Sequence, residues 1–185
     1  GYAASKDGLS IDERSGRPSY IPRAVFEKNG ESDSNFGCED PRLTQIGLPA
    51  SKAGDKIYMT YTAYDGVHPT RVALTSISVL NFLAKRWDKW ANPQLTTPEN
   101  VNDKDTCLLP EKIDGQYMLM HRIDPYLCAD FLDSLDFSKS KITRCIEIMG
   151  PRAGMWDSQK IGIAGPPIKT KKGWLLIYSH IQNYF

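Results

Sequence analysis

The chain has 185 residues, with 23 Lys and Arg against 22 Asp and Glu and 41% hydrophobic positions. This length suffices for one domain with its own core, and the balanced charge without a basic cluster argues against a nucleic-acid-binding protein. No apolar run approaches the roughly 18 residues of a membrane span, and residues 1–15 do not resemble a signal peptide.

The cysteines and histidines form no metal-binding pattern. No CxxC pair occurs, and the three histidines complete no zinc motif. We therefore predict a cytoplasmic protein without a metal ion. Its four cysteines are expected to be reduced, buried thiols: Cys38, Cys107, Cys128 and Cys145.

Three segments of the chain share one pattern: a proline, a short strand, a polar or glycine turn, and an apolar strand led by an aromatic residue. Aligned on their prolines, Pro41, Pro110 and Pro167, the segments lie 69 and 57 residues apart. Runs of Val, Ile, Tyr and Thr flank turns that are typical of β-hairpins. These turns are Asp65-Gly66, Asp114-Gly115 and Lys172-Gly173.

Further strand-like runs follow the hairpins at residues 71–77, 128–132 and 142–149, so each segment holds about four strands. The best helix candidate is 78–90, although a strand end followed by a loop explains this stretch equally well. Four-stranded repeats predict an all-β fold, a β-propeller, with an unrepeated β-sandwich as the alternative.

The repeats do not close into a ring within this sequence. We expect a partial propeller of about two and a half to three blades, the remaining blades coming from sequence outside this chain. The predicted units are the end of a first blade with a linker (1–19), a second blade (20–100), a third blade (101–155) and the start of a fourth (156–185).

The sharpest candidate for chemistry is the strand head Gly37-Cys-Glu-Asp-Pro-Arg42. Side chains alternate on a strand, so only one of Glu39 and Asp40 can face the central channel. Arg42 would share the face of Asp40 and hold its charge. A salt-bridged strand start is the plain structural alternative.

Other candidates gather at the ends of the remaining predicted strands. Lys104, flanked by acids that include Asp105, suits an anion or a sugar hydroxyl, or forms a solvated charge run. Tyr64 and Asp65 place a ring beside a carboxylate, and Trp156 is either a sugar platform or core. Charged residues also end apolar strands or follow turns: Arg71, His121-Arg122 and His180.

Motifs of several other enzyme classes do not occur: GxSxG, the P-loop, GxGxxG, HExxH and the EF-hand loop. Acids, bases and aromatic rings that line one cavity are instead typical of a carbohydrate-active enzyme. Five motifs, in order between about residues 3 and 181, resemble glycoside hydrolase family 130. They are residues 39–44, 58–66, 109–115, 120–122 and 166–178.

This resemblance implies a five-bladed propeller, because the family consists of such folds. Most members are inverting phosphorylases of β-mannosides, and some are β-1,2-mannosidases. Asp40 matches the catalytic general acid, which relays its proton through the mannosyl 3-hydroxyl to the glycosidic oxygen. Lys104, Arg122 and Arg71 match basic positions on the phosphate side, while Tyr64 and Asp65 match sugar-facing positions.

His180 departs from the family pattern. Many members read Tyr-His-Gly where this chain reads Tyr178-Ser-His180, and a shift of one residue on a strand changes the face. We retain His180 as a candidate phosphate ligand on the condition that a bulge restores its direction. From the residues themselves we add Arg42, Asp105 and Trp156 as candidate substrate-binding residues.

The predicted reaction converts a β-mannoside and inorganic phosphate into mannose 1-phosphate and a shortened acceptor, with inversion and without a cofactor. Phosphate is already anionic, so one acid and a cationic cluster suffice, and partial burial would raise the pKa of Asp40. An inverting hydrolase needs a second carboxylate about 6.5–9.5 Å away to activate water. Alternatives are a β-1,2-mannosidase that uses Glu39 or Glu111, a non-catalytic sugar-binding propeller, and an unrelated five-bladed carbohydrate hydrolase. Partners would be a β-manno-oligosaccharide and phosphate, neither nucleic acid nor membrane; whether copies assemble stays open.

Overall fold

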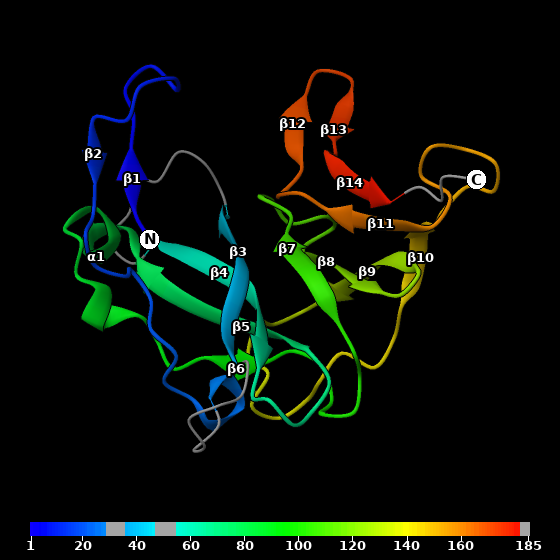
Figure 1. Cartoon of the computed structure of the whole chain (residues 1–185), viewed down its shortest axis with the longest axis horizontal. Helices are drawn as coiled ribbons and strands as arrows, with labels where there is room; N and C mark the ends of the chain where they lie inside the picture. Colours follow the sequence, from blue (N-terminus) through cyan, green and yellow to red (C-terminus); the bar gives the residue numbers. More distant parts are fainter. Residues whose placement is uncertain (29–35, 47–54, 182–185) are drawn as a thin grey trace.

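The structure, a computed structural model, describes residues 1–28, 36–46 and 55–181. Strands dominate these ranges, and helix is confined to α1 (Val79–Leu83) and the 3-10 turns η1 (Val25–Glu27) and η2 (Trp87–Lys89). The all-β prediction is confirmed (Figure 1). Within the same ranges, no helix has the length and apolar character needed to cross a membrane.

Two four-stranded antiparallel sheets form the centre of the molecule (Figure 1). The first has the order β3-β4-β5-β6 and the second the order β7-β8-β9-β10, so each is a simple meander. Their strands are β3 (Gly37–Gln45), β4 (Lys56–Tyr64), β5 (Arg71–Ser78), β6 (Gln94–Leu95), β7 (Lys104–Leu108), β8 (Tyr117–Ile123), β9 (Tyr126–Leu132) and β10 (Ile146–Met149).

Shorter hairpins flank the two sheets. Near the N-terminus β1 (Ala3–Ala4) pairs with β2 (Glu13–Arg14). Beyond the second sheet β11 (Lys160–Ile163) pairs with β14 (Tyr178–Ile181), and the hairpin of β12 (Ile168–Thr170) and β13 (Gly173–Leu175) is inserted between them. The third segment of the sequence pattern thus contains the β12–β13 hairpin, in which Thr170 pairs with Gly173.

The second sheet is buried on both faces. Neighbouring side chains on its strands point in opposite directions, and each set packs against a different part of the protein. Leu108 and Leu119 join a cluster with Leu74 of the first sheet, whereas Cys107 and Met120 join the isoleucines of β11. Each fully buried aliphatic side chain contributes roughly 1.5–3 kcal/mol to this packing. The second sheet therefore lies between the first sheet and the β11–β14 pair.

The heads of β3 and β7 contain the same bulge. Glu39 pairs with Thr62 and Arg42 with Thr60, so two residues of β3 oppose one of β4. In the second sheet Lys104 pairs with Arg122 and Cys107 with Met120, which leaves residues 105–106 opposite residue 121. The first residue of each bulge is an aspartate with φ 53°, Asp40 and Asp105. Asp40 and Asp105 are therefore structural counterparts.

This correspondence corrects the repeat alignment. The structurally equivalent positions are 40 and 105, whereas the sequence alignment placed Pro41 opposite Pro110. Pro41 lies inside the bulge of β3, but Pro110 follows the end of β7. A proline is tolerated both in a bulge and at a strand end, so the shared proline marked two different positions.

The local predictions fared unevenly. The turn at Asp114-Gly115 has positive φ at both residues, as a type I′ hairpin requires. The helix candidate 78–90 contains the single turn of α1, capped by Ser78, and the short 3-10 turn η2; the Ser78 hydroxyl accepts from the Asn81 backbone N–H at 3.2 Å. The strand predicted at 142–149 begins only at residue 146, because Ile142 is buried in the core outside the sheet.

The prediction of four reduced thiols is wrong for two cysteines. Cys128 and Cys145 form a disulfide with their Cα atoms 5.0 Å apart, while Cys38 and Cys107 are free. β10 runs antiparallel to β9 with Glu147 opposite Cys128, which brings the preceding Cys145 beside it. The spacing of 17 residues gave no sign of this pairing.

Candidate active site

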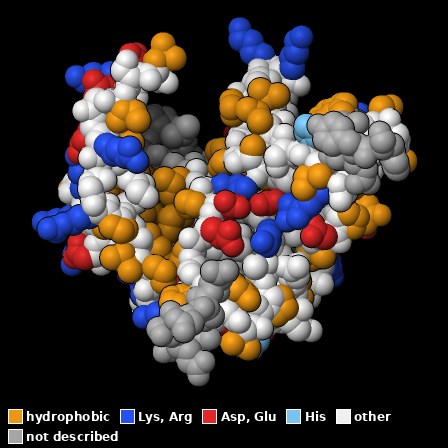
Figure 2. All heavy atoms as spheres, in the orientation of Figure 1, with side chains coloured by type: hydrophobic (Ala, Val, Ile, Leu, Met, Phe, Trp, Pro, Cys, Tyr) orange, Lys and Arg blue, Asp and Glu red, His pale blue; other side chains and the backbone are white. Residues whose placement is uncertain are grey.

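Charged side chains of three strands meet over β7, β8 and β11 (Figure 2). Asp105 accepts from two arginines: Arg122 Nη1 lies 2.5 Å from its Oδ2, and Arg42 Nη2 lies 3.4 Å from its Oδ1. Arg42 Nη2 also donates to the backbone oxygen of Ile163 at 2.5 Å. Arg42 therefore links the first sheet, the second sheet and β11.

Two features hold this cluster tightly. All three side chains are nearly buried, with 9% of Arg42, 11% of Asp105 and 7% of Arg122 exposed. A Cβ added to Gly162 would lie 2.5 Å from the Asp105 carboxylate and 3.1 Å from the Arg122 guanidinium. Glycine at this position thus allows β11 to approach the ion pair directly.

The cationic side of the cluster continues toward solvent. Arg122 Nε lies 2.8 Å from Asp124 Oδ1, but its N–H does not point along this line, so the contact is an ion pair without a hydrogen bond. Lys160 Nζ lies 3.9 Å from the other oxygen of Asp124. Lys104 stands directly opposite Arg122 in the register, which places both side chains on the same face of the sheet.

Three buried guanidinium groups each have one N–H donor without a hydrogen-bond acceptor in the described part of the chain. Within the described ranges, the Nε atoms of Arg42, Arg71 and Arg122 are buried and donate no hydrogen bond. An unsatisfied buried donor costs about 1–3 kcal/mol unless a water molecule, an ion or a ligand accepts from it. The side chain of Lys104 likewise has no ion-pair partner in this part of the chain. This arrangement suits an anion.

Asp40 lies beside this cluster but is not part of its ion pairs. Its side chain is exposed, and Arg42 Nη1 donates to its backbone oxygen at 2.9 Å instead of to its carboxylate. The expected Asp40–Arg42 ion pair is therefore wrong, because the bulge interrupts the regular alternation of side chains. The partial burial expected around Asp40 is also absent from this part of the protein.

Tyr64 lies where an aromatic ring can meet a ligand near Asp40. It stands opposite Gly37 in the register of β3 and β4. With Glu39 it lines a shallow hollow of about 270 Å³ at the heads of these strands, which Phe36, Gly37 and Cys38 complete. Its hydroxyl has no hydrogen-bond partner among the residues that the structure describes.

Asp65 and Arg71 form a second ion pair at the same end of the first sheet. Arg71 Nη2 lies 2.5 Å from Asp65 Oδ2, and only 1% of the Arg71 side chain is exposed. Burial acts to raise the pKa of Asp65, but hydrogen bonds from the backbone N–H groups of His68 and Val67, then from the side chains of His68 and Arg71, lower it strongly overall. Asp65 is thus a fixed anion that orients Arg71.

The predicted platform residue Trp156 belongs to an exposed aromatic group with β14. Its ring stacks on Tyr178 with centroids 5.4 Å apart, and His180 meets it edge-on at 4.6 Å. Ser179, not His180, lies opposite Gly162 in the register and therefore faces the Asp105–Arg122 pair. The structure thus does not bring His180 together with Arg122, and no bulge restores its direction.

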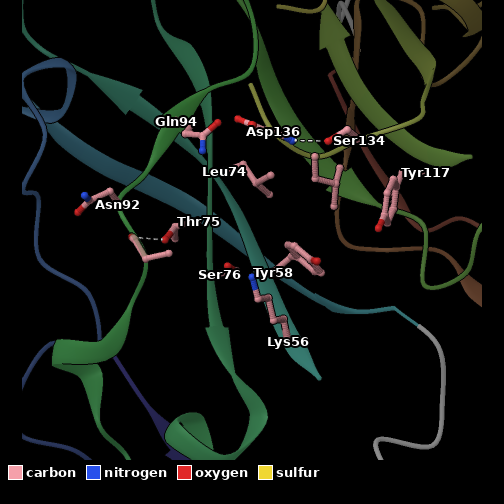
Figure 3. A pocket seen from close by; sticks show the side chains of 12 residues that line it. Lys56, Tyr58, Leu74, Thr75, Ser76, Asn92, Gln94, Tyr117, Ser134 and Asp136 are labelled. Carbon is pink, nitrogen blue, oxygen red and sulfur yellow. Dashed lines mark hydrogen bonds between the residues drawn. The ribbon is translucent and has the colours of Figure 1, made fainter. Parts of the chain in front are cut away.

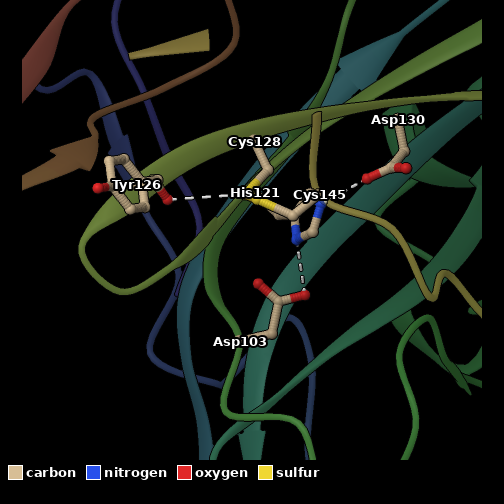
Figure 4. Close-up of a disulfide and its surroundings, with 6 residues drawn as sticks. All are labelled: Asp103, His121, Tyr126, Cys128, Asp130 and Cys145. Atoms are coloured by element: carbon tan, nitrogen blue, oxygen red, sulfur yellow. Dashed lines mark hydrogen bonds and ion pairs between the residues drawn. A yellow bond between two sulfur atoms is a disulfide. The ribbon is translucent and has the colours of Figure 1, made fainter. Parts of the chain in front are cut away.

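Sequence reasoning gave no role to a fully buried group behind these residues. His121 contacts both Asp103 and Asp130, and it lies beside the Cys128–Cys145 disulfide (Figure 4). The charged pair His121-Arg122 at the end of an apolar strand was the signal, because it requires polar partners on both faces of the sheet. Neither aspartate could be assigned as the partner without the fold.

A hollow of about 380 Å³ lies at the other end of the two sheets (Figure 3). It is lined by the start of β4, with Lys56 and Tyr58, and by Tyr117 at the start of β8. None of the predicted site residues lines it. The candidate site is therefore the opposite end, where β3 and β7 begin.

Comparison with known proteins gives one concordant result. The family model described as beta-1,4-mannooligosaccharide phosphorylase, of glycoside hydrolase family 130, matches residues 1–183. A beta-1,2-mannobiose phosphorylase of Thermoanaerobacter sp. (strain X514) is 36% identical over 99% of this chain and 52% of its own length. A 1,2-beta-oligomannan phosphorylase of the same organism is 32% identical over 96% of this chain and 51% of its own length.

A solved structure agrees with these matches. The beta-1,2-mannobiose phosphorylase from Listeria innocua, in complex with beta-1,2-mannobiose, superposes with a TM-score of 0.69 and 26% sequence identity. The match covers 97% of this chain and 44% of that protein. The chain spans about half the length of the relatives that it matches.

Proposed function

This chain belongs to glycoside hydrolase family 130, and on this premise we propose that it is part of an inverting phosphorylase of β-mannosides. The enzyme would use inorganic phosphate to release mannose 1-phosphate and a shortened acceptor. The observation that carries the proposal is the set of three buried arginines whose Nε–H groups donate no hydrogen bond within the described ranges, together with Lys104, which has no ion-pair partner there. The names of the relatives favour a β-1,2-linked substrate over a β-1,4-linked one.

Asp40 is the proposed general acid. Its proton passes through the mannosyl 3-hydroxyl to the glycosidic oxygen while the bond between this oxygen and C1 breaks. A phosphate oxygen forms the new bond to C1 from the opposite face, so the configuration inverts. A residue for this role needs a carboxyl group that no ion pair holds permanently ionised, and Asp40 has no such partner within the described ranges.

The cations act on the nucleophile. Phosphate is already an anion near neutral pH, so the protein must bind and orient it rather than remove a proton from it. Lys104 and Arg122 share one face of the second sheet, and Asp105 holds the Arg122 guanidinium at 2.5 Å. Arg71, oriented by Asp65, completes the proposed phosphate ligands, whereas His180 packs edge-on against Trp156 and is not assigned to the phosphate in this proposal. The reaction then needs no metal or organic cofactor, since phosphate supplies the nucleophile and one carboxyl group supplies the proton.

Substrate would contact the rings and polar groups near the strand heads. Tyr64 in the hollow beside Glu39 and the exposed ring of Trp156 offer surfaces on which a sugar stacks. We propose that Arg42, Asp65 and Asp105 mainly orient the neighbouring charged side chains of the site, because their own side chains are already engaged in ion pairs.

We further propose that the two meanders are blades of a five-bladed propeller with the boundaries predicted from the sequence. The head of each inner strand would then face a common axis, and blades outside this chain would cover Asp40. We also propose a cytoplasmic location, where inorganic phosphate is available as the co-substrate.

The test is a phosphate-dependence assay on the complete protein that contains this chain. Incubation with β-1,2-mannobiose should give mannose 1-phosphate, detected by ³¹P NMR as the α-anomer, only when phosphate is present. Release of free mannose at the same rate without phosphate would overturn the proposal in favour of a β-1,2-mannosidase. Binding of the sugar without turnover would overturn it in favour of a sugar-binding propeller.

A further inference from the structure

We propose that His121 is a positioning residue for the phosphate side of the site. Held between Asp103 and Asp130, it fixes the strand positions that carry Lys104 and Arg122. This inference rests on the proposed function, because His121 acts only through the proposed phosphate ligands Lys104 and Arg122. His121 itself is assigned no contact with a substrate.

The contacts of His121 use both ring nitrogens. Nδ1 lies 2.9 Å from Asp103 Oδ2, and Nε2 lies 2.8 Å from Asp130 Oδ2. None of the His121 or Asp103 side chain is exposed, and only 7% of Asp130 is. Figure 4 shows the imidazole between the two carboxylates, which come from the approach to β7 and from β9. The ring therefore ties together three neighbouring chain segments of one sheet.

Two of the three segments that His121 ties carry a predicted phosphate ligand at the next residue. Asp103 precedes Lys104, and His121 itself precedes Arg122. Neighbouring residues on a strand point to opposite faces, so His121 faces the first sheet while Arg122 faces β11. A shift of the His121 ring must consequently move the backbone of both cations.

The same network reaches the first sheet. The backbone N–H of Asp103 donates to the backbone oxygen of Thr70 at 2.9 Å, and the Thr70 hydroxyl donates to Asn102 Oδ1 at 2.5 Å. Thr70 immediately precedes Arg71, the third predicted phosphate ligand. The cations of both sheets are thus held from behind by one continuous set of hydrogen bonds.

Charge explains why a histidine suits this place. Burial acts to lower the pKa of His121, but the hydrogen bonds and charges of Asp103 and Asp130 raise it to about 9. Those two carboxylates are the titratable groups that contact the ring in the described part of the chain, since the neighbouring Cys128 is held in the disulfide. A protonated imidazole donates to both carboxylates at once, which a neutral one cannot do.

The test compares two variants of the complete protein, each changed at a buried position. His121→Gln removes the charge and one of the two hydrogen bonds. Phe137→Leu makes a small cavity in the core, away from the strand heads, where Phe137 is 3% exposed. We expect His121→Gln to raise KM for phosphate by about 10- to 100-fold with kcat at saturating phosphate largely kept. Phe137→Leu should leave both constants unchanged.

The pH profile provides a second readout that a purely structural role would not move. In the wild type, KM for phosphate should rise above about pH 9 as His121 loses its proton. His121→Gln should lack this step. Asp130→Asn, which keeps a hydrogen-bond acceptor for Nε2, should show a smaller rise in KM and covers the case in which His121→Gln fails to fold.

Hydrogen–deuterium exchange separates failure of this inference from failure of the proposed function. Residues 103–107 and 120–123 should exchange faster in His121→Gln, or in Asp130→Asn, than in Phe137→Leu. If the wild type releases mannose without phosphate, the proposed function fails, and faster exchange still supports positioning by His121. Equal exchange and an equal KM for phosphate in the two sets of variants would overturn the positioning role.

Discussion

Asp40 and Asp105 occupy the same place in two successive repeats, yet their surroundings are opposite. Both open a bulge with φ 53° at the head of the first strand of a four-stranded sheet. The Asp105 side chain is 11% exposed and pairs with Arg42 and Arg122, whereas Asp40 is exposed and its carboxylate pairs with neither. The same bulge thus places one aspartate in a buried ion-pair cluster and the other at the exposed surface of this chain.

The two aspartates therefore suit different roles in the site. A carboxylate between two arginines holds both guanidinium groups in place through charge-assisted hydrogen bonds. A carboxylate without a cation partner is left available to act on a bound substrate. The repeat therefore offers Asp105 as a clamp and Asp40 as a proton donor, and the following predictions test that division.

The largest effect is expected for Asp40→Asn, which tests the proton donor. The amide keeps the size of the side chain but cannot donate an acidic proton, so kcat for phosphorolysis should fall by roughly 10²- to 10⁴-fold. The melting temperature should stay within about 1 °C of the wild type, because the amide has the same size as the carboxyl group and the Asp40 side chain makes no ion pair within the described ranges. Phosphorolysis assays and thermal scans on the complete protein measure both quantities. Near-full activity would remove Asp40 from the mechanism.

Asp105→Asn tests the clamp and should behave in the opposite way. Loss of the carboxylate leaves two nearly buried guanidinium groups without their anion, which should lower the free energy of unfolding by about 2–4 kcal/mol. KM for phosphate should rise about tenfold as Arg122 loses its orientation. Denaturant titration and initial-rate kinetics provide the measurements. A stability equal to that of the wild type would show that the cluster is not clamped.

The sequence predicted the strands better than the site. Alternating Val, Ile, Tyr and Thr with Asp-Gly turns gave the meanders because these signals are local, and the family prediction is confirmed by the match to residues 1–183. The bulge is not local, since it exists only in the pairing of β3 with β4. The sequence therefore predicted an ion pair between Arg42 and Asp40, although the Arg42 guanidinium contacts Asp105, 63 residues away in the chain.

The buried partners were invisible for the same reason. Asp103 and Asp130 lie 18 and 9 residues from His121, and only the β8–β9 register and the approach to β7 bring them together. The blade boundaries and the roles of the individual site residues remain predictions. Fold-level signals accumulate over many residues, whereas the position of one side chain depends on a single register or bulge.

The two strand heads also differ in the buried acids behind them, which predicts a pH effect. Behind β3, Glu27 is fully buried; burial acts to raise its pKa, but hydrogen bonds from Tyr20, Tyr61 and two backbone N–H groups lower it overall. It therefore stays ionised throughout neutral and alkaline pH. Behind β7, His121 carries a proton that it releases near pH 9.

The expected outcome is a loss of stability on the alkaline side that depends on His121. A pKa raised from 6.5 to about 9 stabilises the folded state fully below pH 6.5, and this contribution disappears as the pH rises through 9. Chemical denaturation of wild type and His121→Gln at pH 6, 8 and 9.5 should show a difference that shrinks by up to about 3 kcal/mol across this range. A difference independent of pH would contradict the protonated state.

The smallest effect is expected for His180→Ala, compared with Ser179→Ala. His180 lies edge-on to Trp156, while Ser179 stands opposite Gly162, beside the Asp105 carboxylate. Removal of the imidazole should change KM for phosphate by less than about threefold, because a ring on the far face of the strand cannot reach an anion held by Arg122. A tenfold rise for His180→Ala with no change for Ser179→Ala would instead mean that β14 shifts its register in the complete protein, and that the displaced histidine regains the phosphate contact that the family resemblance implies.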